Sequence, residues 1–370
     1  MIEKEKLGCR LLIITLEIYY QKNHDNLSRR DGRHFIMPSV RIGYWAAHEQ
    51  YSPTQLTKFV IAAEEGGFET VFTSDHFMPW FNSGAHGGFA WAWIAACAAV
   101  TKRIQFGTGV TAPDRYHPAI IAQAFATLDE MFPGRIMLGL GAGEAMNSIP
   151  LGIVFPSPGQ RELRLKNSIE VIRKLWEGNF EDYSGFFYDV HHAKLYTPPK
   201  ARIPLLVAAG GRHSAQLAGK YADGVIGFSG SENIIQIALD AAKNNGKNPD
   251  GFERLIEFKC SYDPDYQKAL DSVKVWRSTM TKGVLSSDIS DPRKLEEEGA
   301  NQVSDKQIEE TWTIVTDVEE LIKPIEALVE QGYSMIQVHS SSPDELSFVK
   351  AFGSRALPRL KEMYPVIRGR

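Results

Sequence analysis

The stretch "SVRIGYWAAHEQYSPTQLTKFVIAAEEGGFETVFTSDH", residues 39–76, contains the pattern that decides the fold. It opens and closes with short apolar runs of the kind found in buried strands. Between them, "SPTQ" at residues 52–55 has the form of a capping box with proline in the first helical turn, which predicts a helix start. The apolar residues that follow recur at helical spacing: Leu56, Phe59, Val60 and Ala63. The stretch therefore predicts one strand, one helix and a second strand.

The same alternation continues along the chain. Eight short apolar runs, most of them followed by a helical pattern, predict eight strands: "SVRIGYW", "TVFTSDH", "IQFGTGVT", "RIMLGLGAGE", "IPLLVAAGG", "GVIGFSG", "RLIEFKCSY" and "SMIQVHSSS". Eight parallel strands with crossover helices close most simply into an α/β fold of the (β/α)8 TIM barrel type. Residues 263–312 predict a helical insertion after strand 7 that could cover the barrel mouth. An open doubly wound sheet is the alternative, although no GxGxxG opens the first crossover.

Residues 37–370 are predicted to form this single barrel domain, and residues 1–36 read as an N-terminal extension. The extension holds an apolar run, "LLIITLEIYY", which Glu17 interrupts and which is too short to cross a bilayer. Two interpretations stay open. Met37 could be the true start, which would make the leader a mis-assigned or disordered segment, or the extension could dock on the barrel.

Composition limits the kinds of partner. The 370 residues are 43% hydrophobic and carry a formal net charge of -4, so neither a nucleic-acid nor a membrane-surface role has electrostatic support. A small-molecule partner fits better. Three widely spaced cysteines form no disulfide framework or CxxC metal site, which fits a reducing cytoplasm. The pair His191-His192 lacks ligands at metal spacing, so no metal site is expected.

Three titratable residues follow predicted strands. Glu49 follows the first, His76 ends the second and Glu144 ends the fourth. Catalytic groups of (β/α)8 barrels lie at the carboxyl ends of strands, so these side chains should face one mouth. Taken singly, His76 could be a packing residue and Glu144 a helix cap, but their coincidence at equivalent strand ends favours a catalytic site. Trp80 lies in the same loop as His76 and is expected to shape the pocket.

Several motifs together resemble one family. "SDHFMPW", "GTGVTAPDRYHPAIIAQAFATL", "PGRIMLGLGAGEAMN", "AAGG" and "YDPD" are similar to the luciferase-like superfamily, in particular to its branch that uses the deazaflavin coenzyme F420. The similarity runs from about residue 42 to about residue 360. The resemblance implies a (β/α)8 barrel, commonly a homodimer, with the deazaflavin in its mouth. By position, the family's catalytic histidine, carboxylate and loop tryptophan are His76, Glu144 and Trp80.

The resemblance also implies cofactor contacts. They fall on Asp75, Ala142, Gly143, Asn147, Gly210, Gly211, His213 and Ser214. Glycines let backbone N–H groups approach a phosphate closely at a helix N-terminus. The family's non-proline cis peptide, which supports the deazaflavin ring, is expected between Val110 and Thr111.

The implied reaction is hydride transfer from an alcohol carbon to the deazaflavin. His76 would take the hydroxyl proton and Glu144 would manage a proton on the ring, although these two roles could be exchanged; Glu49 would orient imidazole or substrate. A flavin-mononucleotide (FMN) monooxygenase and a non-catalytic cofactor-binding barrel are competing possibilities.

The substrate is expected to lack a phosphate. Members of this branch that oxidise glucose 6-phosphate hold the phosphate with two lysines and an arginine, whose positions carry Ser231, Ser286 and Thr311 here. Lys282 could replace only part of that charge. We therefore expect a neutral alcohol or unphosphorylated sugar, in a pocket lined by Trp80, Trp91 and Phe228, with an F420-dependent glucose-6-phosphate dehydrogenase as the alternative.

Overall fold

A computed structural model describes residues 39–228, 233–286 and 288–365. All eight predicted strands are present: β1 (Arg41–Ala46), β2 (Thr70–Thr73), β3 (Gln105–Thr108), β4 (Leu138–Leu140), β7 (Leu205–Ala208), β8 (Gly224–Gly227), β9 (Glu253–Tyr262) and β11 (Met335–Ser340). They pair in parallel in the order β3-β2-β1-β11-β9-β8-β7-β4. Parallel bridges from Phe106 to Ile136 and from Thr111 to Leu140 join the two ends of this order. The prediction of a (β/α)8 barrel is confirmed, and the open sheet is wrong because its two edges meet.

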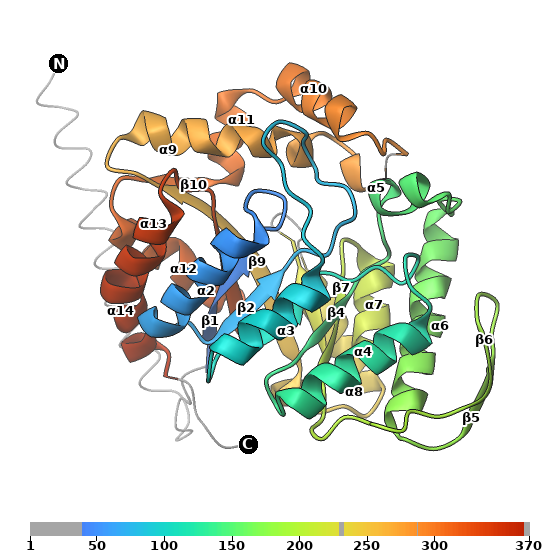
Figure 1. The fold of residues 1–370 in the computed structure, drawn as a ribbon. Helices are drawn as coiled ribbons and strands as arrows, with labels where there is room; N and C mark the ends of the chain where they lie inside the picture. The colour runs from blue at the N-terminus through green and yellow to red at the C-terminus, as the bar shows by residue number, and fades with distance from the viewer. Residues whose placement is uncertain (1–38, 229–232, 287, 366–370) are drawn as a thin grey trace, which may run out of the picture. The chain divides into compact units, whose positions relative to one another are not determined.

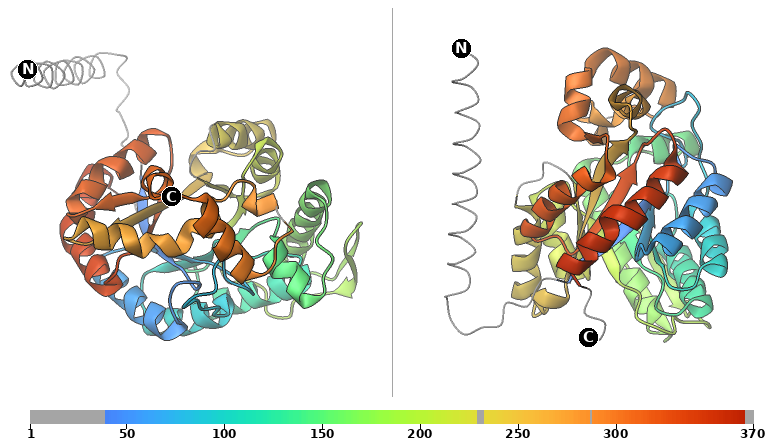
Figure 2. Two further views of the ribbon diagram at one scale, coloured as in Figure 1. Left: turned by 90° about the horizontal axis from the view of Figure 1, so that it is seen from above. Right: turned by 90° about the vertical axis from the view of Figure 1, so that its left-hand side faces the viewer.

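Helices cover the outside of the strands (Figures 1 and 2). They are α2 (Pro53–Gly66), α3 (Ala90–Val100), α4 (Pro118–Met131), α6 (Pro158–Trp176), α7 (Arg212–Tyr221), α8 (Ile234–Asn244), α12 (Ile322–Glu330), α13 (Glu345–Ala351) and α14 (Leu357–Met363). The α2 start is the predicted capping box, in which Ser52 Oγ accepts from Gln55 N and Gln55 Oε1 accepts from Ser52 N. Leu56, Phe59, Val60 and Ala63 are buried as the spacing predicts. None of the helices in the described ranges has the length and apolarity needed to cross a membrane.

Residues 263–286 and 288–312 contain short helices between β9 and the short strand β10 (Thr313–Val315), which pairs with the end of β9. These helices are α9 (Tyr266–Val273), the 3-10 segments Lys274–Met280 and Val284–Ser286, α10 (Pro292–Gln302) and α11 (Asp305–Thr311). They lie together beyond one end of the barrel (Figures 1 and 2). Side chains inside the barrel and on these helices form one apolar cluster that includes Trp45, Met335, Trp276 and Trp312. The insertion is therefore packed onto the barrel mouth.

One smaller feature was not expected from the sequence: the hairpin of β5 (Glu181–Ser184) and β6 (Asp189–Ala193) is a separate two-stranded sheet. The helix considered after Glu144 is present as α5 (Ala145–Ser148), a single turn. The predicted N-terminal extension, residues 1–36, lies outside the described residues.

Candidate active site

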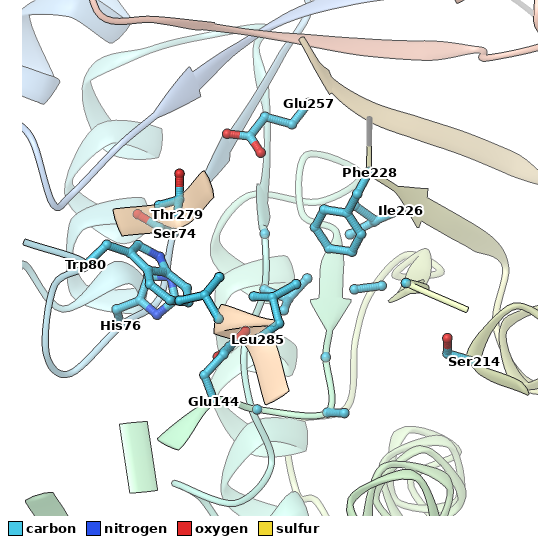
Figure 3. Close-up of a pocket in the computed structure, with 18 of the residues that line it drawn as sticks. Ser74, His76, Trp80, Glu144, Ser214, Ile226, Phe228, Glu257, Thr279 and Leu285 are labelled. Atoms are coloured by element: carbon cyan, nitrogen blue, oxygen red, sulfur yellow. The ribbon is translucent and has the colours of Figure 1, made fainter. Parts of the chain in front are cut away.

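A cavity of about 510 Å3 opens where the strands end. Its walls come from the segments that follow the barrel strands and from the insertion (Figure 3). Most of the predicted site residues line it: Glu49, His76, Trp80, Val110, Ala142, Gly143, Glu144, Gly210, Ser214, Phe228 and Thr311. In Figure 3, Ser74, His76 and Trp80 lie on one side of the cavity and Ser214 lies on the other. The strand-end residues are thus brought together as the barrel prediction requires.

His76 and Glu49 form a pair at one side of this cavity. His76 Nε2 lies 3.3 Å from Glu49 Oε1, and the Glu49 side chain is only 4% exposed. Ser74 Oγ donates to Glu49 Oε2 at 2.5 Å, and the backbone N–H of His48 donates to Ser74 Oγ. The carboxylate is therefore held from behind while its other oxygen faces the imidazole.

Asn147 fixes the orientation of His76 from the opposite side. The Phe77 N–H donates to Asn147 Oδ1 at 2.7 Å, so the amide nitrogen points the other way. That nitrogen donates to Glu144 Oε2 at 3.0 Å and lies 2.9 Å from His76 Nδ1. Because an amide nitrogen only donates, His76 Nδ1 must accept and the imidazole proton lies on Nε2, toward Glu49. The structure places Asn147 behind the cavity wall as the link between His76 and Glu144.

The environment of Glu144 argues against a capping role. It occupies the N-cap position of α5, yet its side chain makes no capping hydrogen bond. Its carboxylate faces Asn147 and the cavity instead. Trp80, with 8% exposure, meets the His76 ring edge to face, with centroids 5.5 Å apart.

Asp75 and Thr111 were expected to contact the cofactor, but both are buried and neither lines the cavity. Thr111 Oγ1 donates to Asp75 Oδ2 at 2.8 Å, and Arg115 Nη1 donates to the Asp75 backbone oxygen at 2.6 Å. Burial raises the pKa of Asp75, although Arg115 opposes the shift. Trp91 donates to Thr111 from within the core, so the prediction that Trp91 lines the pocket is wrong. This network holds the backbone on which His76 is carried.

The predicted cis peptide is displaced by one residue. The non-proline cis bond joins Gly109 to Val110, whereas Val110–Thr111 is trans. The Thr111 N–H donates to Gly139 O, which pairs Thr111 with β4 in parallel. A Cβ on Gly109 would meet the Trp45 ring at 2.3 Å, so a glycine is needed beside the cis bond. Gly109 and Val110 both line the cavity.

The far side of the cavity offers a cradle for an anion. Gly210 and Gly211 precede α7, and a Cβ on either would meet no atom within 4 Å. The Ser214 hydroxyl lies in the first turn of α7, where it accepts from Gly211 N, whereas His213 is exposed and does not line the cavity. Free N–H groups at a helix N-terminus favour a negative group. Arg161 adds a charge that sequence reasoning missed: Nη1 donates to Gly143 O, and its buried Nε has no partner.

Three positions were expected to lack the cations that hold a phosphate in relatives, and the structure describes only one of these side chains in full. Ser231 lies outside the described residues, and of Ser286 only the backbone is described, in a 3-10 turn. Thr311 is exposed at the cavity rim and donates to Gln307 O. Lys282 is exposed and does not line the cavity, so it replaces no missing cation there.

Sequence reasoning also missed three residues on the strands themselves. Glu257 and Lys259 of β9 and His339 of β11 line the cavity. Burial alone would raise the pKa of Glu257, but Lys259 and the hydrogen bond with His339 outweigh it and hold the pKa below its usual range. The signal was present in "IEFKC", where charged residues alternate with apolar ones in a strand expected to be buried. No cluster of histidine, cysteine and carboxylate side chains in the described ranges could hold a metal ion.

Comparison with known proteins agrees with this fold and cavity. The family model described as "Luciferase-like monooxygenase" matches residues 35–335, and the chain belongs to this family. An F420-dependent glucose-6-phosphate dehydrogenase of Segniliparus rotundus is 37% identical over 332 residues, which cover 88% of this chain and 99% of that protein. The corresponding protein of Nakamurella multipartita is 34% identical over 333 residues, 88% of this chain and 98% of the relative.

Solved structures extend the comparison. An F420-dependent secondary alcohol dehydrogenase in complex with an F420-acetone adduct superimposes with a TM-score of 0.84 at 34% identity, covering 87% of this chain and 99% of that one. A coenzyme F420 dependent tetrahydromethanopterin reductase from Methanopyrus kandleri shares the fold, with a TM-score of 0.70 at 21% identity over 87% of this chain and all of the other. The resemblance expected from the motifs is confirmed.

Proposed function

We propose that this protein is an F420-dependent dehydrogenase that oxidises the CH–OH group of a small neutral alcohol or unphosphorylated sugar. The observation that carries the proposal is one cavity in which His76 and Glu49 face a glycine-bordered anion cradle. Relatives and a structural neighbour are named for F420 dependence. The deazaflavin, when bound, exchanges a hydride with the alcohol carbon.

The residues present fit this cofactor. Its phosphate would lie at Gly210, Gly211 and Ser214 of the cradle, where the glycines leave open space and Arg161 offers an unpartnered Nε. Ala142, Gly143 and Val110 would border the ring system. Cofactor choice can be tested by titrating the protein with F420 and with FMN, which absorb at different wavelengths. Tight FMN binding with oxygen-dependent turnover would refute F420 dependence.

The hydrogen bonds of the site support one division of the proton roles among His76, Glu49 and Glu144. Without substrate, the Nε2–H of His76 faces Glu49; the substrate hydroxyl would take over this N–H as its donor and pass its own proton to Glu49. Glu144, held by Asn147, would hold a proton at the ring. Replacing His76 with alanine, or Glu49 or Glu144 with glutamine, should each lower kcat by about 10²–10⁴, the usual worth of a positioned acid or base. Near-wild-type kcat in any of these variants would remove that residue from the mechanism.

The charges around the cavity support a neutral substrate. Among the described residues that line it, carboxylates outnumber cations: Glu49, Glu144, Glu162 and Glu257 against Arg161 and Lys259. Lys259 lies 3.9 Å from Glu257, so part of its charge is already compensated. A phosphate dianion in this setting would be under-compensated at a cost of several kcal/mol.

An F420-dependent glucose-6-phosphate dehydrogenase is the second candidate, because relatives of 34% and 37% identity carry that name and one lysine does line the cavity. Steady-state assays with glucose 6-phosphate, glucose and isopropanol separate the two. We expect kcat/KM for the phosphate ester to be the lowest or similar. A value about 10³-fold above the others would establish the second candidate. From the family resemblance we further propose a cytoplasmic homodimer.

A further inference from the structure

A second polar cluster lies in the cavity, on strands that the proposed proton transfer does not use. Glu257 and Lys259 project from β9 and His339 from β11. His339 Nδ1 lies 2.5 Å from Glu257 Oε1, so this nitrogen donates and the imidazole is held in one orientation. The reacting pair, His76 and Glu49, follows β2 and β1 instead. We call Glu257, Lys259 and His339 the floor cluster.

One atom of the floor cluster has no partner. The His339 side chain is 2% exposed, and its buried Nε2 makes no hydrogen bond. A buried polar nitrogen without a partner costs about 1–3 kcal/mol, which a ligand that hydrogen-bonds to it would recover. Because His339 lines the cavity, that ligand would enter from the substrate side.

Aromatic rings surround the floor cluster. The His339 ring lies 4.7 Å from Trp276, 5.1 Å from Trp312 and 6.3 Å from Trp45 between centroids. Lys259 Nζ lies 5.8 Å from the Trp312 centroid. Trp45 and Trp276 also line the cavity. The cavity floor therefore offers flat apolar faces beside an acceptor, a donor and one unsatisfied nitrogen.

We propose that the floor cluster is a binding subsite for hydroxyl groups of a polyhydroxylated neutral substrate, a polyol or unphosphorylated sugar, beyond the hydroxyl that is oxidised. The proposal rests on the proposed function and narrows its substrate class. A hydroxyl group both donates and accepts, so neighbouring hydroxyls match the Glu257 carboxylate and the Lys259 ammonium together. The C–H face of such a molecule packs against indole rings. A dianion matches poorly, since Glu257 is held ionised there.

The test measures binding by calorimetric titration of the full-length protein. Glucose is compared with cyclohexanol, a ring of similar size with one hydroxyl, without cofactor and again with reduced F420, which cannot accept a hydride. We expect glucose to bind more tightly than cyclohexanol. Glu257→Gln and Lys259→Met should each weaken glucose binding by about tenfold or more, the usual worth of a hydrogen bond to a charged group, and leave cyclohexanol binding unchanged.

A matched control is Glu253→Gln, the same substitution at the start of β9, where Glu253 pairs with Arg41 outside the cavity. It should leave glucose binding unchanged. Because Glu257→Gln disturbs a buried hydrogen bond, the Lys259→Met variant provides a second reading if the first does not fold.

The outcomes separate this inference from the proposed function. Equal binding of glucose and cyclohexanol to the wild type, or unchanged glucose binding in both variants, overturns the subsite. If glucose binds and the variants lose it while no alcohol reduces F420, the subsite stands and the proposed function fails. If isopropanol is oxidised equally by wild type and variants while only glucose turnover falls, both are supported.

Discussion

At the scale of the residue, one amide organises the candidate active site. Asn147 is 1% exposed, and its three contacts reach Phe77, His76 and Glu144. The Phe77 N–H requires an acceptor and Glu144 requires a donor. If the amide oxygen and nitrogen exchanged places, a donor would face a donor at Phe77 and an acceptor would face an acceptor at Glu144. The protonated nitrogen of His76 is thereby set by a residue that does not line the cavity.

The substitution Asn147→Asp tests this assignment. A carboxylate can still accept from Phe77 N–H, but it cannot donate to His76 Nδ1 and it repels Glu144. In the neutral imidazole the proton should move to Nδ1, so that Nε2 has no hydrogen in this form, and kcat should fall by about 10²–10⁴. The pH profile of kcat should also move, because a carboxylate beside Nδ1 favours the imidazolium.

Asn248→Asp is the control, because this side chain is exposed outside the cavity and aspartate can still accept from Asp250 N, so kcat should stay close to that of the wild type. A wild-type kcat in a well-folded Asn147→Asp protein would show that the tautomer of His76 does not affect turnover.

A second residue-scale prediction concerns Glu345, which lies at the start of α13 and is 3% exposed. Burial raises its pKa to about 8, although hydrogen bonds such as that from Tyr44 at 2.9 Å oppose the rise. Since the folded state holds this proton more tightly than the unfolded state, its contribution to stability is full below the usual glutamate pKa and is lost as pH rises toward 8. Glu345→Gln removes this dependence. We compare the Tm of the variant minus the Tm of the wild type at two pH values. This difference should be several degrees more positive at pH 8.5 than at pH 5. An equal difference at the two pH values would contradict the raised pKa of Glu345.

At the scale of the element, the sequence predicted those parts whose signals are local. The eight strands follow from apolar runs, and α2 follows from its capping box and its buried spacing. The hairpin of β5 and β6 was missed because its strands are short and only one of their residues, Val190, is buried, which leaves little apolar pattern. β10 was missed because three residues carry too little pattern.

The candidate site divides in the same way. Residues at strand ends, such as His76 and Glu144, were predicted because parallel strands bring their ends together. Asp75 and Asn147 were predicted as cofactor contacts. The hydrogen bonds that they make to neighbouring side chains could not be predicted, because contact with a ligand and support of a side chain require the same residue types. Glu257 and His339 were missed because they lie within strands. The alternation in "IEFKC" marks Glu257 as unusual for a buried strand, but only the barrel's closure shows that both side chains reach the cavity.

The insertion provides an element-scale prediction. Gly299 of α10 packs on the segment Lys274–Met280, and a Cβ there would lie 2.5 Å from the backbone N of Ser278. Gly299→Ala should push α10 away and lower stability by about 1–3 kcal/mol, as overpacking usually does. Because Trp276, Thr279 and Met280 line the cavity, KM for the substrate should rise as well.

Gly251→Ala is the control, since a Cβ there meets nothing within 4 Å. Thermal unfolding and steady-state kinetics measure both variants. An unchanged Tm and KM for Gly299→Ala would show that the insertion adapts without disturbing the barrel mouth.

At the scale of the whole molecule, the proposed homodimer needs a surface. The helices α3 and α4 lie side by side on the outside of the barrel (Figure 1). They carry large apolar side chains that are more than half exposed: Val100 at 57%, Ile120 at 52% and Met131 at 54%. A stable dimer buries about 800 Å2 on each partner, an area that two helices of 11 and 14 residues can supply.

We therefore expect a second copy of this chain to cover α3 and α4, and Ile120→Glu to produce a monomer. A buried unpaired carboxylate in an interface costs several kcal/mol, enough to move a dimer into the monomeric range at micromolar concentration. Val154→Glu, at a side chain 84% exposed between α5 and α6, introduces the same charge away from these helices and should leave the dimer intact. Sedimentation velocity measures all three proteins. A monomeric wild type would refute the homodimer, whereas a dimer that survives Ile120→Glu would place its interface on another face of the barrel.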